Sequence, residues 1–278
     1  MIGDTFKVAC LQVNAGTDMA ANIETACCFA VEARAVGAEL ILMPENVAMM
    51  EWGRTNIVLK AQPEAEHQAL TAFRELAREM NCWIHTGTLH IALDGGKVAN
   101  RSYVLDKNGL ILGRYDKIHM FDVDLGGGEA YRESATFMPG DRATMVRLPW
   151  GRLALSVCYD LRFPQLYRAY ANAGADFLAI PAAFTRTTGK AHWHALLRAR
   201  AIENGCYVFA PAQCGTHANN RETYGHALIV SPWGEILADG LEQPGWVMAE
   251  VDVRKVAEAR KMIPSLEHDR AFIEPVRD

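Results

Sequence analysis

The sequence predicts an α/β fold, because strand-like apolar runs alternate with helical runs along most of the chain. No linker or low-complexity segment interrupts this alternation. The 278 residues, 50% of them hydrophobic, are enough for one large domain with a sizeable core. We therefore predict a single domain over residues 1–278, with a C-terminal tail from about 263 to 278.

In the first half, the predicted strands are apolar runs bounded by turn residues, at 6–13, at 38–43 and in a series over 82–115. The predicted helices repeat apolar residues at helical spacing, at about 22–36 and 63–80. Gly37 is placed to end the first helix. Pro44 ends the second strand, because proline has no N–H to donate to a ladder.

The second half follows the same order. Its predicted strands lie at 153–157, 175–180, 206–211, 223–230 and 246–252, and its predicted helices at 164–173, about 190–203 and about 253–261. The segment 37–44 (GAELILMP) is similar to 174–181 (GADFLAIP). This similarity indicates either a core with two-fold pseudo-symmetry or a βα connection of a common kind.

Composition and charge argue against several classes of function. Lys plus Arg is 28 and Asp plus Glu is 33, a formal net charge of −5 without a basic stretch, so we predict that neither nucleic acid nor an anionic membrane is the main partner. No apolar run approaches the roughly 18 residues of a membrane span, and the N-terminus does not resemble a signal peptide. Seven scattered cysteines indicate reduced thiols, so we predict a cytoplasmic protein.

Three polar residues, Glu45, Lys117 and Cys158, follow predicted strands, where open α/β sheets collect functional groups. A cysteine attacks a carbonyl carbon as the thiolate, and a nearby carboxylate can accept its proton and return it to a departing amine. The carboxylate raises the pKa of the thiol, whereas an ammonium group offsets this and can hold an oxyanion. Each residue alone also has an ordinary structural interpretation, as a buried thiol, a turn residue or a solvated lysine.

The residues around these three positions resemble the signature blocks of the carbon–nitrogen hydrolases, the nitrilase superfamily. The blocks are 42–46 (LMPEN), 115–122 (YDKIHMFD) and 157–164 (VCYDLRFP). They come in the order typical of the family, and the similarity extends from about residue 6 to 272. The resemblance implies a four-layer αββα sandwich of the nitrilase type.

The resemblance also implies a role for each site residue. Cys158 would be the nucleophile, Glu45 the general base and Lys117 the stabiliser of the oxyanion. The backbone N–H of Tyr159 would be the second oxyanion donor, and Glu133 matches a further glutamate that the family often has near the lysine. An amide would transfer its acyl group to Cys158 and release ammonia, and water would hydrolyse the thioester without a metal or an organic cofactor.

Within the superfamily, the chain is most similar to the small amidases of the Nit branch. Residues 212–215 (AQCG), His217, Arg221 and 224–226 (YGH) resemble amidases of deaminated glutathione. The alternatives are an ω-amidase, which acts on α-ketoglutaramate, and a broader aliphatic amidase. The first two substrates carry a carboxylate near the scissile amide, so we predict that Arg162 binds it, with Phe184 and Thr188 in the pocket wall. The alternatives are a structural salt bridge for Arg162 and core packing for Phe184.

Other features lead to further hypotheses. The run Gly126-Gly127-Gly128 predicts a flexible lid beside Glu133 or a plain surface loop. His192 and His194 stand two residues apart on a predicted helix and so point to different sides, from which we predict no metal site. The resemblance implies a homodimer that acts on a small-molecule amide.

Two other classes of function compete with the amidase. One is a thiol hydrolase that uses Cys158 with a histidine base such as His119. The other is a non-catalytic binding or assembly module, although such a chain has no reason to keep all three polar residues. Replacing Glu45 by Gln separates the amidase from the thiol hydrolase, because only the amidase needs that carboxylate.

Overall fold

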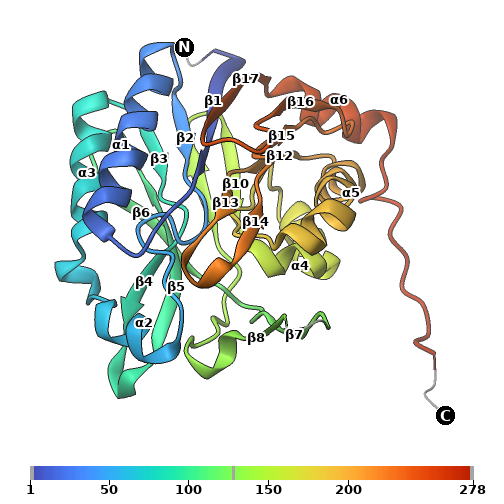
Figure 1. Cartoon of the computed structure of the whole chain (residues 1–278). Helices are drawn as coiled ribbons and strands as arrows, with labels where there is room; N and C mark the ends of the chain where they lie inside the picture. The colour runs from blue at the N-terminus through green and yellow to red at the C-terminus, as the bar shows by residue number, and fades with distance from the viewer. Residues whose placement is uncertain (1–2, 127–128, 276–278) are drawn as a thin grey trace.

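The computed structural model describes residues 3–126 and 129–275, and Figure 1 shows its layers. Two β-sheets pack face to face, and helices cover the outer face of each. The first sheet is covered by α1 (Met19–Ala35) and α3 (Gln68–Met80), and the second by α4 (Pro164–Asn172) and α5 (Arg186–Asn204). This arrangement is the four-layer αββα sandwich that the sequence implies.

The first sheet has nine strands in the order β14–β13–β1–β2–β3–β5–β4, with β17 paired to β1 and β6 paired to β5. Its strands are β1 (Thr5–Val13), β2 (Leu40–Leu42), β3 (Trp83–His85), β4 (Leu89–Ala92), β5 (Val98–Leu105), β6 (Ile111–Asp116), β13 (Ala212–Thr216), β14 (Glu222–Tyr224) and β17 (Gly245–Asp252). The neighbours β1, β2 and β3 run parallel, as helical crossovers require.

The second sheet has six strands in the order β16–β15–β12–β11–β10–β9. Its strands are β9 (Met145–Leu148), β10 (Gly151–Leu155), β11 (Phe177–Ala179), β12 (Tyr207–Ala210), β15 (Leu228–Val230) and β16 (Ile236–Asp239). A separate hairpin joins β7 (Asp122–Asp124) to β8 (Ala130–Arg132). The other helices are α2 (Arg54–Lys60), α6 (Arg254–Met262) and the 3₁₀ turns η1 (Glu64–Glu66), η2 (Asp94–Gly96), η3 (Glu133–Ala135), η4 (Cys158–Arg162) and η5 (Ala218–Asn220).

Strand β1 shows how the layers are filled. Val8 and Cys10 belong to the core that the first sheet shares with the second, whereas Ala9 and Leu11 belong to the core under α1 and α3. Successive side chains of a strand point to opposite faces, so a strand between two apolar layers is apolar at every position. This is why the run at 6–13 is nearly continuous in hydrophobic residues.

The similar segments 37–44 and 174–181 lead into β2 and β11, which hold equivalent places in the two sheets. Each sheet contains three neighbouring parallel strands joined by helical crossovers, β1–β2–β3 in one and β10–β11–β12 in the other. This equivalence favours the pseudo-symmetric interpretation of the repeated segment.

The prediction of one strand over 223–230 is wrong. The chain forms β14 in the first sheet and β15 in the second, because Gly225 and His226 take positive φ angles of 75° and 54° and turn it between the sheets. Helix α5 begins at Arg186 instead of residue 190, because the side chain of Thr185 caps its N-terminus. The elements α2, β7, β8, β9, β13 and β16 have no counterpart among the predicted ones.

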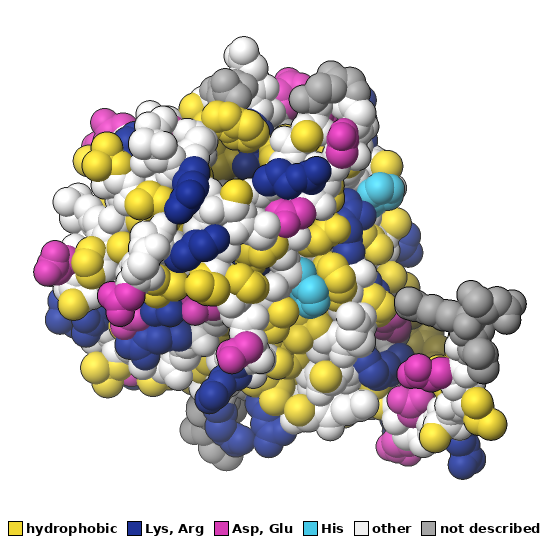
Figure 2. All heavy atoms as spheres, turned by 90° about the horizontal axis from the view of Figure 1, so that it is seen from below, with side chains coloured by type: hydrophobic (Ala, Val, Ile, Leu, Met, Phe, Trp, Pro, Cys, Tyr) yellow, Lys and Arg dark blue, Asp and Glu magenta, His cyan; other side chains and the backbone are white. Residues whose placement is uncertain are grey.

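Beyond α6, residues 263–275 form no helix or strand and extend away from the sandwich (Figure 1). Among the described residues, none of the helices combines the length and the apolar character that a bilayer span requires. On the face seen in Figure 2, Lys and Arg side chains are interspersed with acidic and hydrophobic ones.

Candidate active site

Glu45, Lys117 and Cys158 come together from both sheets. Glu45 follows β2, Lys117 directly follows β6, and Cys158 begins η4 just after β10. The first two therefore come from the first sheet and the cysteine from the second, and the site lies between the sheets. All three residues are buried, with 3, 2 and 7% of their surface exposed, respectively.

The lysine joins two carboxylates. Lys117 Nζ lies 3.0 Å from Glu45 Oε1 and 2.9 Å from Glu133 Oε1. The same Glu45 oxygen accepts a hydrogen bond of 3.0 Å from the side-chain amide of Asn100, and its other oxygen accepts one of 2.9 Å from the backbone N–H of Ala183. Glu45 is thus fixed by three donors, and a carboxylate held in this way stays ionised.

The directions of the pKa shifts assign the proton in the resting site. Burial by itself raises the pKa of Glu45, but the charge and hydrogen bonds of Lys117 outweigh it and bring the pKa below its usual range. Burial by itself lowers the pKa of Lys117, but the charges of Glu133 and Glu45 outweigh burial and raise the pKa above its usual range. Lys117 therefore stays an ammonium group. Burial and the charge of Glu45 raise the pKa of Cys158 far above its usual range, although Lys117 opposes them. The offset by the lysine is therefore incomplete, and the resting pair is a neutral thiol beside an ionised carboxylate.

The backbone at Cys158 is unusual. Its φ angle is +48°, a conformation that costs a non-glycine residue about 1–2 kcal/mol. Its N–H donates a hydrogen bond of 2.9 Å to the carbonyl of Pro181, so this N–H is already engaged. Among the described residues, no group accepts a hydrogen bond from the next backbone N–H, that of Tyr159. The free donor in this turn is thus the one that the sequence predicts for the oxyanion.

A buried aspartate holds this turn. Asp160 Oδ2 accepts hydrogen bonds from the Val157 N–H (2.8 Å) and from the Tyr115 hydroxyl (2.7 Å). Its other oxygen accepts them from the backbone N–H of His119 (3.0 Å) and from the ring of the same histidine (2.6 Å). His119 therefore supports the loop and is not among the residues that line the cavity at Cys158. The hypothesis of a histidine base at this position finds no support.

The fourth predicted residue, Glu133, begins η3 next to the β7–β8 hairpin. Its Oε2 accepts a hydrogen bond of 2.6 Å from the backbone N–H of Phe121, and its Oε1 lies 3.4 Å from the amide of Asn100. Asn100 therefore contacts both glutamates and has no signal in the sequence beyond its place in a strand. Only the pairing of β5 with β6 brings it beside Lys117.

The cavity at the site has a volume of about 360 Å³. Its walls include Glu45, Lys117, Glu133, Cys158, Tyr159, Phe184 and Thr188, among the predicted residues. Apolar and aromatic side chains form much of the rest, including Trp52, Phe121, Tyr131 and Phe137. The β8 side of the hairpin contributes to this wall, whereas Gly127 and Gly128 of the predicted lid lie outside the described residues.

Arg162 takes a different position from the predicted one. It is not among the residues that line the cavity. Its guanidinium lies 5.1 Å from the ring centre of Phe184, and its Nη1 lies 3.2 Å from Nδ1 of His192. Its salt bridge with Asp160, the alternative interpretation, is not among the ion pairs of the described residues either. Its role in binding a carboxylate stays a prediction.

A second arginine does line the cavity. Arg221 Nη2 donates a hydrogen bond of 2.9 Å to the carbonyl of Ala183, and the guanidinium lies 5.3 Å from the ring centre of Tyr131. Within the described part of the chain, its buried Nε has no hydrogen-bond partner. A guanidinium group on a cavity wall is suited to an anionic ligand. In the sequence, Arg221 belongs to the residues that resemble amidases of deaminated glutathione, but its place on the cavity wall was not predicted, because it follows η5, far from all three signature blocks.

No group of metal-ligating side chains lies in the described part of this cavity. The one such group among the described residues is formed by His194, His226 and Asp239, none of which lines the cavity.

Comparisons with known proteins show the family of the chain. A model of the carbon-nitrogen hydrolase family matches residues 7–261. Deaminated glutathione amidase of Synechocystis sp. is 41% identical over 272 residues, which are 96% of this chain and 99% of that protein. The crystal structure of the C. elegans NitFhit protein, 35% identical, matches with a TM-score of 0.91 over 97% of this chain and 66% of that one. Saccharomyces cerevisiae Nit3, a member of branch 10 of the nitrilase superfamily, is 26% identical, with a TM-score of 0.84 over 94% of each chain.

These matches extend over nearly the whole sequence, well beyond the three blocks around Glu45, Lys117 and Cys158. The chain belongs to the carbon–nitrogen hydrolase family and is an amidase of the nitrilase superfamily.

Proposed function

We propose that the chain hydrolyses a small carboxylate-bearing amide through a thioester on Cys158. The observation that carries this proposal is the convergence of Cys158, Glu45 and Lys117 in one buried cavity. A thiol, a general base and a fixed cation are the groups that acyl transfer from an amide requires.

In the first half of the reaction, Cys158 Sγ attacks the amide carbon while its proton moves to the ionised Glu45. The raised pKa of the thiol, caused by burial and by Glu45, means that proton transfer accompanies the attack instead of preceding it. Lys117 Nζ and the Tyr159 N–H hold the oxyanion. Glu45 then gives the proton to the departing nitrogen, and the C–N bond breaks.

In the second half, Glu45 takes a proton from water, and the water oxygen attacks the thioester carbon. The C–S bond then breaks, the acid leaves, and Glu45 returns the proton to Cys158 Sγ. Throughout, Glu133 keeps Lys117 charged and in place, because it lies 2.9 Å from Nζ and takes part in raising its pKa. The charged groups that the reaction uses are thus the side chains of Glu45, Lys117 and Glu133.

We propose deaminated glutathione as the substrate, because the similar protein of Synechocystis sp. is named deaminated glutathione amidase. Its carboxylates need a cation, and Arg221 on the cavity wall is placed to supply one. Since glutathione carries its amide between glutamate and cysteine, the deaminated substrate would release cysteinylglycine, and ammonia would come only from primary amides. The alternative substrate is α-ketoglutaramate.

The test compares deaminated glutathione, α-ketoglutaramate and hexanamide side by side, with the released amine or ammonia and the acid both measured. The proposal expects the highest kcat/KM for deaminated glutathione and no turnover by Cys158→Ala. A higher kcat/KM for α-ketoglutaramate would reassign the chain as an ω-amidase. Full activity of Cys158→Ala would reject the thioester.

We also propose that the protein is a cytoplasmic homodimer. All seven cysteines are free thiols, as a reducing compartment requires. Large apolar side chains stay exposed on and after α6, among them Met262, Ile263, Phe272 and Ile273. Such residues are expected to be covered by a second copy of the chain.

A further inference from the structure

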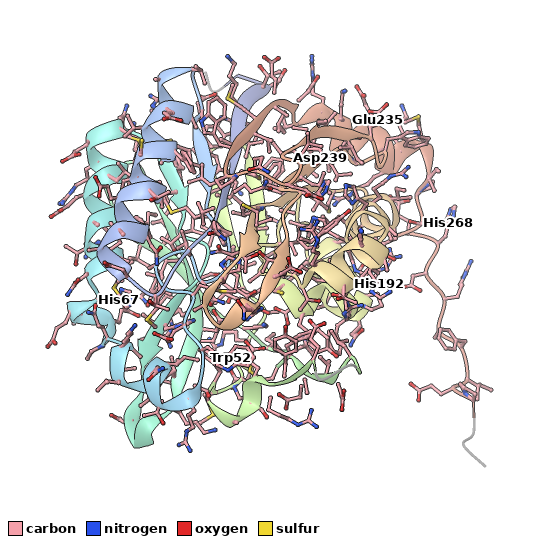
Figure 3. The ribbon with its side chains drawn as sticks, in the orientation of Figure 1. Trp52, His67, His192, Glu235, Asp239 and His268 are labelled. Carbon is pink, nitrogen blue, oxygen red and sulfur yellow. The ribbon has the colours of Figure 1, made fainter. Side chains whose placement is uncertain are left out.

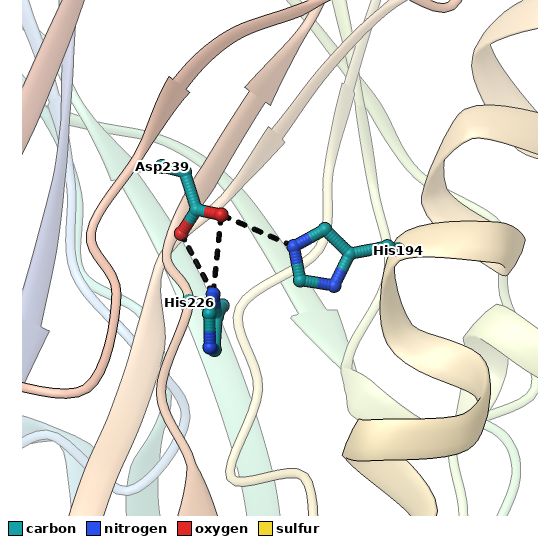
Figure 4. A group of neighbouring side chains, drawn as sticks. All are labelled: His194, His226 and Asp239. Carbon is teal, nitrogen blue, oxygen red and sulfur yellow. Dashed lines mark hydrogen bonds and ion pairs between the residues drawn. The ribbon is translucent and has the colours of Figure 1, made fainter.

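Three side chains from separate elements converge on the flank of the molecule. His194 comes from α5, His226 from the turn before β15, and Asp239 from the end of β16 (Figure 4). Asp239 Oδ2 lies 3.1 Å from His194 Nε2, and Oδ1 lies 2.8 Å from His226 Nδ1. One potential ligand atom from each residue lies within 4.8 Å of the other two.

We infer that His194, His226 and Asp239 form a site for a divalent transition-metal ion of the zinc type. Two imidazole nitrogens and one carboxylate oxygen are the ligands that Zn²⁺ prefers, whereas Mg²⁺ and Ca²⁺ prefer oxygen ligands alone. In a tetrahedral zinc site neighbouring ligand atoms stand about 3.3 Å apart, given zinc–ligand bonds of about 2.0–2.1 Å. Asp239 Oδ2 lies 3.1 Å from both His194 Nε2 and His226 Nδ1, so these two separations need an expansion of only a few tenths of an ångström, with the ion in place of the shared protons. The two ring nitrogens lie within 4.8 Å of each other.

The surroundings hold the ligands in place. The backbone N–H of Leu241 donates a hydrogen bond of 2.9 Å to Asp239 Oδ1 and fixes the carboxylate. His226 has a φ angle of +54°, and the indole N–H of Trp193 donates a hydrogen bond of 2.8 Å to its carbonyl. Its ring stacks on that of Tyr224, with the ring centres 4.4 Å apart. Strained backbone that is fixed from several sides is typical of functional positions.

The site is open to solvent and separate from the catalytic cavity. The side chains of His194, Asp239 and His226 are 31, 25 and 15% exposed, so an ion can enter and water can fill the fourth position. Figure 3 shows Asp239 far from Trp52, which lines the cavity. A bound ion would therefore tie α5 to the edge of the second sheet and take no part in amide hydrolysis.

The prediction that His192 and His194 do not share a metal agrees with this arrangement, because His192 contacts Arg162 instead. That argument concerns only this pair of histidines and does not apply to a metal site that His194 forms with other residues. The partners of His194 lie 32 and 45 residues later in the chain, and only the fold brings them together.

The test is zinc binding to the Cys158→Ala protein without a polyhistidine tag, so that the catalytic thiol does not contribute. Calorimetry should find one Zn²⁺ per chain. His194→Ala should weaken this binding at least about tenfold, as loss of a ligand does. His192→Ala removes a histidine from the same helix and should bind as the parent does. Equal zinc affinity in the parent and His194→Ala would overturn the site.

Two further measurements keep the result independent of misfolding. Co²⁺ should give the strong visible absorption of a tetrahedral site in the parent and not in His194→Ala or Asp239→Asn. Zinc should raise the Tm of the parent and of His192→Ala, and leave the Tm of His194→Ala unchanged. In the otherwise wild-type chain, His194→Ala should keep the parent kcat/KM for amide hydrolysis. Octahedral cobalt spectra in all variants would also contradict the inference.

Discussion

In the proposed mechanism, Glu45 and Cys158 divide the chemistry between an ionised carboxylate and a neutral thiol, and the position of one proton sets the reaction. Burial and the charge of Glu45 keep the thiol protonated, while Lys117 keeps the carboxylate charged. We therefore expect Cys158 to become nucleophilic only when a substrate carbonyl lies beside Sγ and Glu45 accepts the thiol proton. A buried thiol without this pair, such as Cys10, has a raised pKa from burial and no base to accept its proton.

At this scale, Glu45→Gln should reduce kcat about 10²- to 10⁴-fold, because the amide cannot accept the thiol proton. The side chain keeps its size and can still accept hydrogen bonds from Lys117 and Asn100. Thermal unfolding should confirm that the variant is folded, and the rate is measured with the best amide substrate. Activity within twofold of the parent would remove Glu45 from the role of base.

The two arginines allow a matched comparison of substrate binding. Arg221→Ala should raise KM for deaminated glutathione about 10- to 100-fold, since a hydrogen bond to a charged group contributes roughly 1.5–3 kcal/mol. It should leave KM for hexanamide, which has no carboxylate, nearly unchanged. Arg162 does not line the cavity, so Arg162→Ala should have the smaller effect on the acidic substrate. A larger effect of Arg162→Ala would restore the original prediction for that residue.

At the scale of the elements, the turn from β3 to β4 sets the position of the base. Gly87 in this turn has a φ angle of +63°, and a Cβ there would overlap the carbonyl of Pro44, the residue before Glu45. The next residue, Thr88, also contacts this segment, because its N–H lies 3.3 Å from the same carbonyl. The glycine thus lets two loops approach so closely that Glu45 points into the cavity.

Gly87→Ala should therefore lower both stability and kcat, because the Pro44 segment must move. Gly96 provides the control: its φ angle is +71°, and among the described residues a Cβ there meets no atom within 4 Å. Gly96→Ala should cost only the backbone strain of about 1–2 kcal/mol and keep the parent kcat. Urea unfolding and initial rates measure both effects, and equal kcat values for the two variants would contradict this explanation.

A group of buried histidines near α3, β3 and β4 makes the fold sensitive to acid. Burial lowers the pKa of His67 to about 4, of His85 to about 3 and of His90 to about 4. All three are therefore neutral in the folded chain at pH 5.5, whereas in the unfolded chain, with a pKa near 6.5, they bind protons. The sign follows: stability is complete above pH 6.5 and falls as the pH decreases towards 4.

We expect each of these histidines to reduce the free energy of unfolding by about 1.4 kcal/mol at pH 5.5 relative to pH 7.5. His85→Gln should lose stability at pH 7.5 but depend less steeply on pH than the parent. Urea unfolding of the parent and of His85→Gln at both pH values gives the pH dependence of the free energy of unfolding for each protein. An identical pH dependence in the parent and the variant would rule out His85 as a source.

At the scale of the whole molecule, the proposed catalytic residues lie where the two sheets meet. Glu45 and Lys117 belong to one sheet and Cys158 to the other, so the geometry of the site depends on the packing between the sheets. The apolar layer between the sheets must therefore stay rigid for the cavity to keep its shape.

The proposed homodimer is tested on the C-terminal tail. Phe272 and Ile273 are 81 and 96% exposed, so replacing both by Ser should leave the chain folded and shift the mass in light scattering from dimer towards monomer. Leu59→Ser, at an equally exposed position of α2, is the control and should stay dimeric. A parent that is monomeric at micromolar concentration would refute the dimer.

Local signals predicted much of this structure. Strands at 6–13 and 246–252 and the helix at 164–173 follow from continuous or periodic hydrophobicity, and β1, β17 and α4 occupy these ranges within two residues. The prediction of one strand at 223–230 was wrong, because the positive φ angles of Gly225 and His226 divide this run between two sheets. Asn100 has no such signal, and the place of Arg221 on the cavity wall follows only from the fold, since both residues contact groups far away in the chain.

The sequence by itself determined the α/β order of the elements and pointed to the thiol, the acid and the amine of the proposed mechanism, because periodicity and signature blocks are local in the chain. The tertiary structure alone decided which groups touch: the direction of each pKa shift, the arginine on the cavity wall, and the meeting of His194 with Asp239. The physical reason is that electrostatic and hydrogen-bond energies depend on distances in space, which the packing of two sheets sets between residues far apart in the chain.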